Sequence, residues 1–354
     1  MRITIEKRLT PSLLWQVTSI LLALLVSVFV SALLLISAKA DLATSFGALW
    51  DGAFGDWRAV WKTLVKATPL ILTGVAAAVA FRARIWNIGA EGQLFAGAIV
   101  AYGASLWIGH FPSLIAVTLM FVAGAAGGAL YGGLAGYIRA RFNVNEVLTT
   151  VMLNYVIIYL LSFFLTGPWR DPQSFSQQSP KVVDVTFLPN LLAGTKLHFG
   201  FLVALAAAVV VHIIITRTSL GYEIRAVGMN EKASRFKGIN VERTVVMVML
   251  ISGAIAGLAG VTEVFGVHGR IKPDISVGFG FTGIVIAILA SLNPIAVMFI
   301  AVIFGGFVNG GIRLQVATGV PSTLTDAIQA IILLFFLTAA VLARYEFKFG
   351  SHNE

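Results

Sequence analysis

The chain contains no cysteine and little charge. None of its 354 residues is Cys, and Asp, Glu, Lys and Arg together make up 12% of them. Without Cys there are no disulfides, no zinc sites with thiolate ligands and no thiol catalysis. Soluble globular domains carry about 25% charged residues, roughly twice the fraction found here. The composition is therefore not that of an ordinary soluble domain.

Motifs for catalysis and nucleotide binding are also missing. No GxxxxGK[ST] phosphate-binding loop occurs, so we expect that the chain is not itself an ATPase. The five His residues show no HExxH or other ligand spacing, and no Ser/His/Asp set stands out. A GxGxxG run at Gly278, Gly280 and Gly283 opens an apolar stretch instead of following a strand, which argues against dinucleotide binding. We expect no catalytic residue, no metal and no cofactor, and hence no enzyme.

Apolar residues are what the chain has in excess. They make up 58% of it, and the mean hydropathy is +0.90. They form blocks of about 20 residues, the length a helix needs to cross a hydrocarbon core roughly 30 Å thick. The blocks lack the alternation of membrane barrel strands, so we predict an all-α polytopic membrane helix bundle. The ten predicted transmembrane helices are 13–37, 64–81, 88–108, 114–137, 147–166, 200–216, 244–265, 278–292, 294–312 and 324–343.

The net charge of +9 bears on orientation more than on partners. Lys and Arg are not arranged with aromatics on one basic face, so we expect no nucleic-acid partner. Basic residues instead favour the cytoplasmic ends of membrane helices, which predicts that both termini are cytoplasmic. On this orientation a cytoplasmic segment covers about 217–243 and an extracytoplasmic loop about 167–199. The first apolar stretch is too long for a cleaved signal peptide, and we expect a single transmembrane domain over residues 1–354.

Glycine recurs every fourth residue from Gly124 to Gly136, and Gly253 and Gly257 repeat the spacing. Residues four apart share one face of a helix, and a stripe of small residues lets a neighbouring backbone approach closely. We interpret these stripes as helix-packing surfaces.

Polar residues at membrane depth are the candidates for function. Each costs free energy unless it finds a partner, so such residues face the interior of a bundle or a water-filled path. Two interpretations stay open: hydrogen bonds that hold helices together, or a substrate pathway. The candidate pathway residues are Asn87, Glu91, Gln93 and Asn154, followed by Asn309 and by the aromatic Phe281, since aromatic side chains also line solute pathways.

Four segments resemble one family of transport proteins. They are NIGAEGQ at 87–93, NEVLTTVMLNY at 145–155, AVGMNEKASRFKGI at 226–239 and SGAIAGLAG at 252–260. Together they resemble the permeases of ABC importers for nucleosides and simple sugars. These belong to a superfamily that also holds ribose and branched-chain amino-acid permeases.

The resemblance implies a membrane-spanning permease subunit in the bacterial inner membrane. The expected partners are a separate ATP-binding subunit, a second homologous permease, an extracytoplasmic solute-binding lipoprotein and the lipid bilayer. ABC-importer permeases dock on the ATPase through a cytoplasmic EAAxxxG helix, and Lys232 stands here at its acidic position. The implied coupling residues are Gly228, Asn230, Ala233, Ser234 and Gly238.

Two alternatives remain at this stage. One is a secondary transporter or channel that works without an ATPase, which would be expected to carry acid–base relays in its membrane helices. The other is an ABC permease for a different small solute, such as a branched-chain amino acid.

Overall fold

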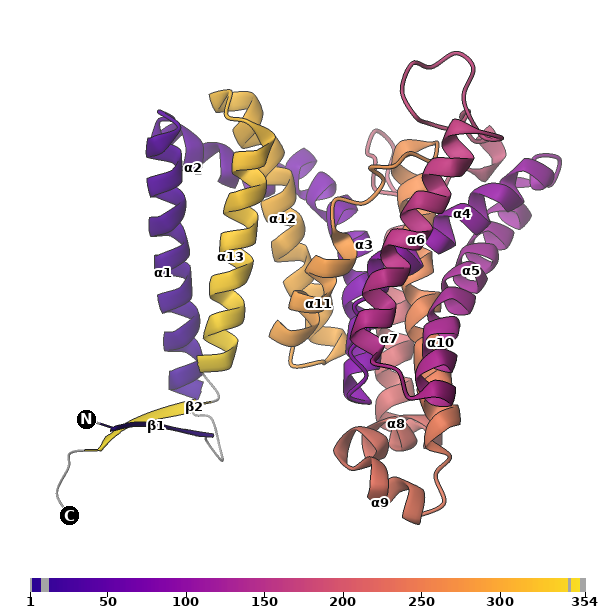
Figure 1. Ribbon diagram of the computed structural model, residues 1–354. Coiled ribbons are helices and arrows are strands. Elements are labelled where there is room, and N and C mark those ends of the chain that lie inside the picture. The colour runs from indigo at the N-terminus through magenta and orange to yellow at the C-terminus, as the bar shows by residue number, and fades with distance from the viewer. Residues whose placement is uncertain (1, 8–12, 343–344, 351–354) are drawn as a thin grey trace. The chain divides into compact units, whose positions relative to one another are not determined.

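A computed structural model describes residues 2–7, 13–342 and 345–350 (Figure 1). Helices account for most of them, in agreement with the predicted fold class. The helices are α1 (Leu13–Ser37), α2 (Leu42–Trp50), α3 (Trp57–Arg82), α4 (Ala90–Ile108), α5 (Ser113–Phe142), α6 (Glu146–Thr166), α7 (Gly200–Arg217), α8 (Ser219–Met229), α9 (Glu231–Phe236), α10 (Val241–Val261), α11 (Phe279–Leu289), α12 (Pro294–Thr318) and α13 (Ser322–Leu342). Short π and 3-10 segments are η1 (Asp51–Gly55), η2 (Asp184–Thr186) and η3 (Thr262–His268).

Two strands that the apolar pattern did not predict pair with each other. Strand β1 (Arg2–Lys7) lies antiparallel to β2 (Tyr345–Gly350), with Arg2 opposite Gly350. Both segments alternate apolar and polar residues, which is the period of a strand. Each has 6 residues, far fewer than the roughly 20 of a membrane helix.

Seven of the described helices are long and apolar enough to cross a membrane: Trp57–Arg82, Ser113–Phe142, Glu146–Thr166, Gly200–Arg217, Val241–His268, Pro294–Thr318 and Ser322–Ala339. Helix α4 is not among these seven, and the polar Glu91 and Gln93 in its first turn lower its mean hydropathy. Helix α11 has 11 residues, or about 16 Å of length. That is about half of a bilayer core, so α11 alone is too short to cross it. Ten spans and cytoplasmic termini stay predictions.

The chain forms two compact units. The first comprises residues 1–59 and 307–354, and the second residues 60–306. In the first unit α1 packs along α13, and Leu35, Leu314, Val320 and Ile328 form a buried cluster.

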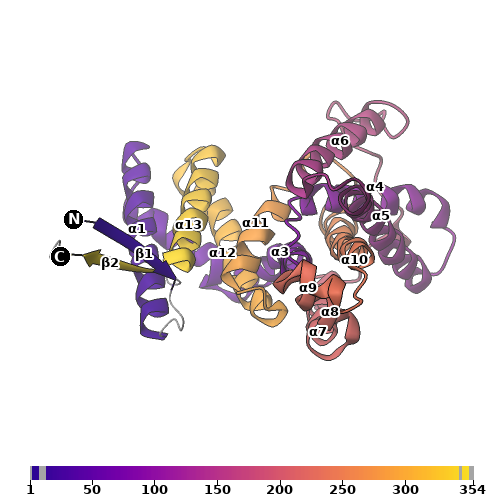
Figure 2. The same ribbon diagram turned by 60° about the horizontal axis from the view of Figure 1, so that its bottom comes forward.

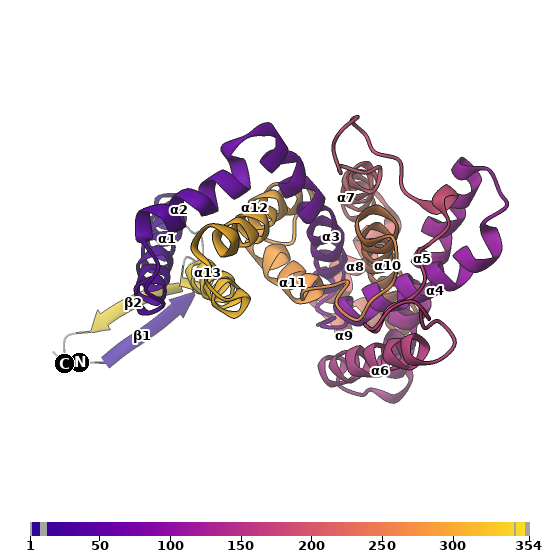
Figure 3. The ribbon, with the colours of Figure 1, turned by 90° about the horizontal axis from the view of Figure 1, so that it is seen from above.

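Helices α4, α5 and α10 pack closely against one another in the second unit (Figures 1 and 3). Glycines let the backbones of α5 and α10 come into contact. A Cβ added to Gly128 would lie 2.7 Å from the Cα of Gly257, and one added to Gly132 would lie 2.5 Å from the carbonyl oxygen of Met249. The predicted role of the glycine stripe on α5 as a packing surface is confirmed.

The polypeptide between α3 and α4 is unwound. Helix α3 ends at Arg82, Arg84 has a positive φ of 56°, and α4 begins after Gly89. This stretch, residues 83–89, is called the α3–α4 corner below. Non-helical backbone within a membrane bundle must find hydrogen-bond partners in the protein or in water. The partners of the α3–α4 corner identify the candidate site.

Candidate functional site

Asn87, at the α3–α4 corner, is the centre of a buried hydrogen-bond cluster. Its Nδ2 donates to Oε1 of Gln93 at 3.0 Å and to Oγ of Ser252 at 2.9 Å. Its Oδ1 accepts from the backbone N–H of Gly89 at 2.9 Å and from Nε2 of Gln93 at 3.0 Å. Ser252 in turn donates to the carbonyl of Ala76 on α3 at 2.8 Å. The cluster therefore ties the corner to α3, α4 and α10.

Glu91 joins α4 to the start of α11. Its Oε2 accepts from the backbone N–H of Gly280 at 2.7 Å. A carboxylate is stabilised at a helix N-terminus by the free N–H groups and the helix dipole. A Cβ on Gly280 would collide with the backbone of Glu91, and Gly278 has a φ of +84°. The GxGxxG run is thus used for a left-handed turn and close packing.

Asn154 holds the corner from the side of α6. Its Nδ2 donates to the carbonyl of Ile88 at 3.0 Å, and its Oδ1 accepts from the N–H of Gly92 at 2.8 Å. Asn87, Glu91, Gln93 and Asn154 are each at most 4% exposed. The structure brings these four predicted residues into one region.

The other two predicted residues differ. Phe281 follows Gly280 on α11 and is 47% exposed. Asn309 belongs to the first unit, where its Nδ2 donates to the carbonyls of Gly52 at 2.6 Å and Ala59 at 3.2 Å. These bonds hold the η1 turn against α12.

The predicted coupling residues lie on α8, α9 and the turns beside them (Figure 2). Oδ1 of Asn230 accepts from the N–H of Ala233 at 3.0 Å, and Oγ of Ser234 donates to the carbonyl of Asn230 at 2.9 Å. Asn230 therefore caps α9. A Cβ on Gly228 would collide with the carbonyl of Arg82, so α8 packs directly on the end of α3. Gly238 ends α9 with a φ of +83°.

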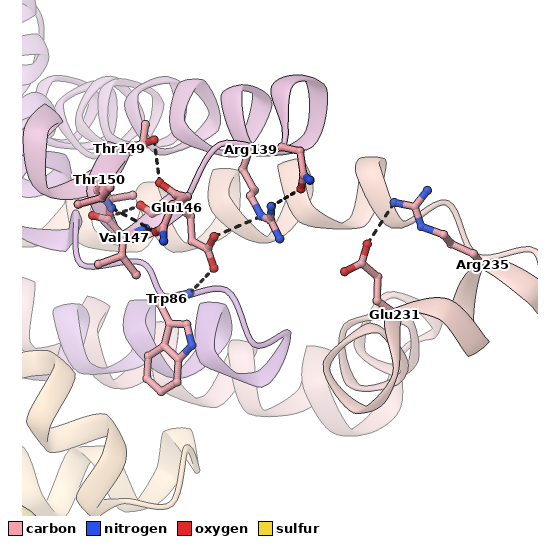
Figure 4. Close-up of polar contacts among 11 residues, drawn as sticks. Trp86, Arg139, Glu146, Val147, Thr149, Thr150, Glu231 and Arg235 are labelled. Atoms are coloured by element: carbon pink, nitrogen blue, oxygen red, sulfur yellow. Dashed lines mark hydrogen bonds and ion pairs between the residues drawn. The ribbon is translucent and has the colours of Figure 1, made fainter.

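A cavity of about 650 Å³ opens between α8–α9, the α3–α4 corner and the α5–α6 turn. Its charged lining residues are Arg84, Arg139, Glu146, Glu231, Lys232 and Arg235. Figure 4 shows two ion pairs on its walls, Arg139–Glu146 at 3.2 Å and Arg235–Glu231 at 3.1 Å. We call this cavity the α8–α9 pocket.

Known proteins with similar sequences identify the family. The family described as "Branched-chain amino acid transport system / permease component" matches residues 60–337. A guanosine ABC transporter permease protein of Bacillus subtilis, NupP, is 36% identical over 89% of this chain and 91% of its own length. The chain belongs to this permease family.

Two further relatives of the permease are informative. A glucose ABC transporter permease protein of Haloferax volcanii, TsgB13, is 33% identical over 96% of the permease and 91% of its own length. A second guanosine ABC transporter permease protein of Bacillus subtilis, NupQ, is 25% identical over 69% of the permease and 78% of its own length. The permease is thus similar to two guanosine permease proteins of one organism, and more similar to NupP than to NupQ.

Three residues that contact the α3–α4 corner or Asn87 were not predicted from the sequence. Ser252 contacts Asn87 from 165 positions away, and Thr150 and Glu146 contact the corner from α6. A signal for the last two was present, since Glu146, Thr150 and Asn154 are spaced four apart and share one helix face. Ser252 had no comparable signal, because a Ser in an apolar helix commonly bonds its own backbone.

Proposed function

We propose that the permease translocates a nucleoside, as the membrane-spanning subunit of an ATP-driven importer. The observation that carries this is the hydrogen bond that joins Glu91, just after the unwound α3–α4 corner, to Gly280 at the start of the short helix α11, beside the amides of Asn87 and Gln93. Transporter substrate sites are typically built where helices are interrupted. Amide and hydroxyl groups suit the hydroxyls and ring nitrogens of a nucleoside. In this proposal Asn87, Glu91, Gln93, Asn154 and Phe281 border the pathway.

A simple sugar is the second candidate, because TsgB13 is a glucose permease protein by name. Both substrate classes present hydroxyl groups, and guanosine is the substrate named for the more similar NupP. A branched-chain amino acid would bring two charges. The Glu91 carboxylate already accepts a hydrogen bond from Gly280, so the cluster has no free charged group to pair with the two charges of such a solute. The same engagement argues against a free acid–base relay of a secondary transporter.

The proposal includes the arrangement in the membrane and the partners. Residues 1–354 act as one transmembrane domain with ten spans in the bacterial inner membrane, and both termini are cytoplasmic. The segment 217–243 then faces the cytoplasm and a separate ATP-binding subunit, and the loop 167–199 faces a solute-binding lipoprotein. A second homologous permease completes the path, a proposal supported by the similarity to both NupP and NupQ.

Uptake of radiolabelled solutes tests the proposed substrate. Cells that lack the permease are expected to lose ATP-dependent uptake of guanosine and to keep uptake of glucose, and re-expression is expected to restore it. Loss of glucose uptake alone would replace the nucleoside by a sugar. Guanosine uptake that survives depletion of ATP would overturn the assignment to an ATP-driven importer.

A further inference from the structure

Three polar side chains on α6 contact the α3–α4 corner and the start of α4. Glu146, Thr150 and Asn154 stand four residues apart, so they form one stripe along the helix. Oε1 of Glu146 accepts from the N–H of Trp86 at 3.5 Å, and Oγ1 of Thr150 accepts from the N–H of Ile88 at 3.3 Å. Asn154 bonds Ile88 and Gly92, as described above. We call this stripe the α6 ladder.

The α6 ladder supplies hydrogen bonds that the unwound corner does not make within a helix. Buried backbone N–H and C=O groups are almost always paired, and an unpaired one costs free energy. The C=O of Ile88 accepts from Asn154, and its N–H is shared between Thr150 and the carbonyl of Trp86, which lies at 3.1 Å. Because the bonds to Asn154 and Thr150 come from one face of one helix, the corner is coupled to α6.

One end of the ladder lies in the wall of the α8–α9 pocket (Figure 4). Oε2 of Glu146 pairs with Nε of Arg139 at 3.2 Å, while its other oxygen faces Trp86. Arg139 also donates to Oδ1 of Asn143, which ends α5. The other end of the ladder, Asn154, adjoins Glu91 through the N–H of Gly92. The ladder therefore runs from the pocket to the polar cluster.

The opposite end of the corner is held by α8. Gly228 packs on the carbonyl of Arg82, the last residue of α3. The seven residues from Ala83 to Gly89 are thus held by α8 at one side and by α6 at the other. A displacement of α8 that carries the end of α3 with it would shift the corner relative to α6 and so strain or break the ladder.

We propose that Glu146 and Thr150 are positioning residues that pass movement of α8 and α9 through the corner to the polar cluster. This inference rests on the proposed function, in which a partner ATPase moves α8 and α9. Neither side chain is assigned to substrate contact. Their expected effect is on the number of ATP molecules hydrolysed for each solute imported.

The permease contains a matched control for Thr150. Thr149 is its neighbour on α6, and its hydroxyl donates to the carbonyl of Asn145, four residues back. Thr150 makes the equivalent bond to Glu146, and in addition accepts from Ile88. Thr150→Val and Thr149→Val therefore remove the same chemistry on the same helix and differ in the contact with the corner.

The test is to reconstitute the intact transporter in proteoliposomes and to measure ATP hydrolysis and solute uptake together. Thr150→Val is expected to raise the ratio of ATP hydrolysed to solute imported about fivefold, the scale of one lost hydrogen bond. Thr149→Val and Thr150→Ser are expected to leave the ratio at the wild-type value. Co-purification of the ATPase is expected to stay normal in all three variants.

Equal ratios for Thr150→Val and Thr149→Val would overturn the inference and leave the proposed function standing. If Thr150→Val does not reach the membrane, Arg139→Gln decides, because it removes the ion-pair partner of Glu146, the pocket end of the ladder, at a partly exposed side chain. An unchanged ratio in that variant would again overturn the inference. A wild-type permease that copurifies with no ATPase would instead overturn the proposed function.

Discussion

At the scale of single residues, His198 is the most unusual group of the second unit. It is 0% exposed, and neither ring nitrogen has a hydrogen-bond partner among the described residues. Its ring lies against Gly200 and Gly266, at the end of the loop 167–199. Burial lowers the pKa of His198 from 6.5 to about 4, and the Glu263 carboxylate opposes this only in part. His198 is therefore neutral at neutral pH.

This gives stability a defined pH dependence. The folded protein binds the His198 proton only near pH 4, whereas the exposed imidazole of the unfolded chain binds it below about pH 6.5. The stability is therefore complete above about pH 6.5 and is lost as the pH falls towards 4, by up to about 1.4 kcal/mol per pH unit. Thermal unfolding in detergent at about pH 7.5 and about pH 5.5 measures this loss.

The variant His198→Gln is expected to show a smaller loss than the wild type over this pH range. His110→Gln is the control, because His110 is exposed. If His198→Gln and the wild type lose stability equally, the imidazole of His198 is not the cause.

At the scale of elements, the contact between α5 and α10 depends on the absence of side chains. Gly128→Ala is expected to lower stability by about 1–3 kcal/mol, because the new Cβ would meet the backbone of Gly253 and Gly257. Gly47→Ala on α2 is the matched control, since a Cβ there has no atom within 4 Å. In a helix interior that change is expected to be neutral or to stabilise by up to about 1 kcal/mol. Melting temperatures in one detergent compare the two, and an equal effect would refute the packing argument.

At the scale of the whole molecule, the proposed coupling to an ATPase can be separated from backbone strain. Gly238 and Gly194 have φ values of +83° and +77°, and a Cβ on either meets nothing within 4 Å. A side chain at either position is thus strained to a similar degree. Gly238→Leu is expected to reduce ATPase co-purification and uptake at least tenfold, the scale of about 1.4 kcal/mol of lost binding. Gly194→Leu, on the proposed outer loop, is expected to keep co-purification. Similar losses in both variants would remove α9 from the coupling role.

The sequence by itself determined the features that depend on neighbouring residues or on the surrounding bilayer. In a membrane only helices and closed barrels pair all backbone groups, and these apolar blocks lack the alternation of barrel strands, so the helical fold was predictable. The glycine spacing on α5 predicted its packing face, and Asn145 and Asn230 cap the helices that follow them. The four quoted segments, including 87–93 and 145–155, predicted the permease family that the similar proteins bear out.

Only the tertiary structure decided which polar groups meet. Asn154 and Asn309 look alike in the sequence, as single amides in apolar helices, yet one bonds the α3–α4 corner and the other bonds the η1 turn. Glu91 meets Gly280 from 189 positions away, and no local pattern encodes that pairing. A helix forms through bonds between residues four apart, so its residues reveal it. The partner of a buried side chain depends on how helices pack, which is set by contacts spread over the whole chain.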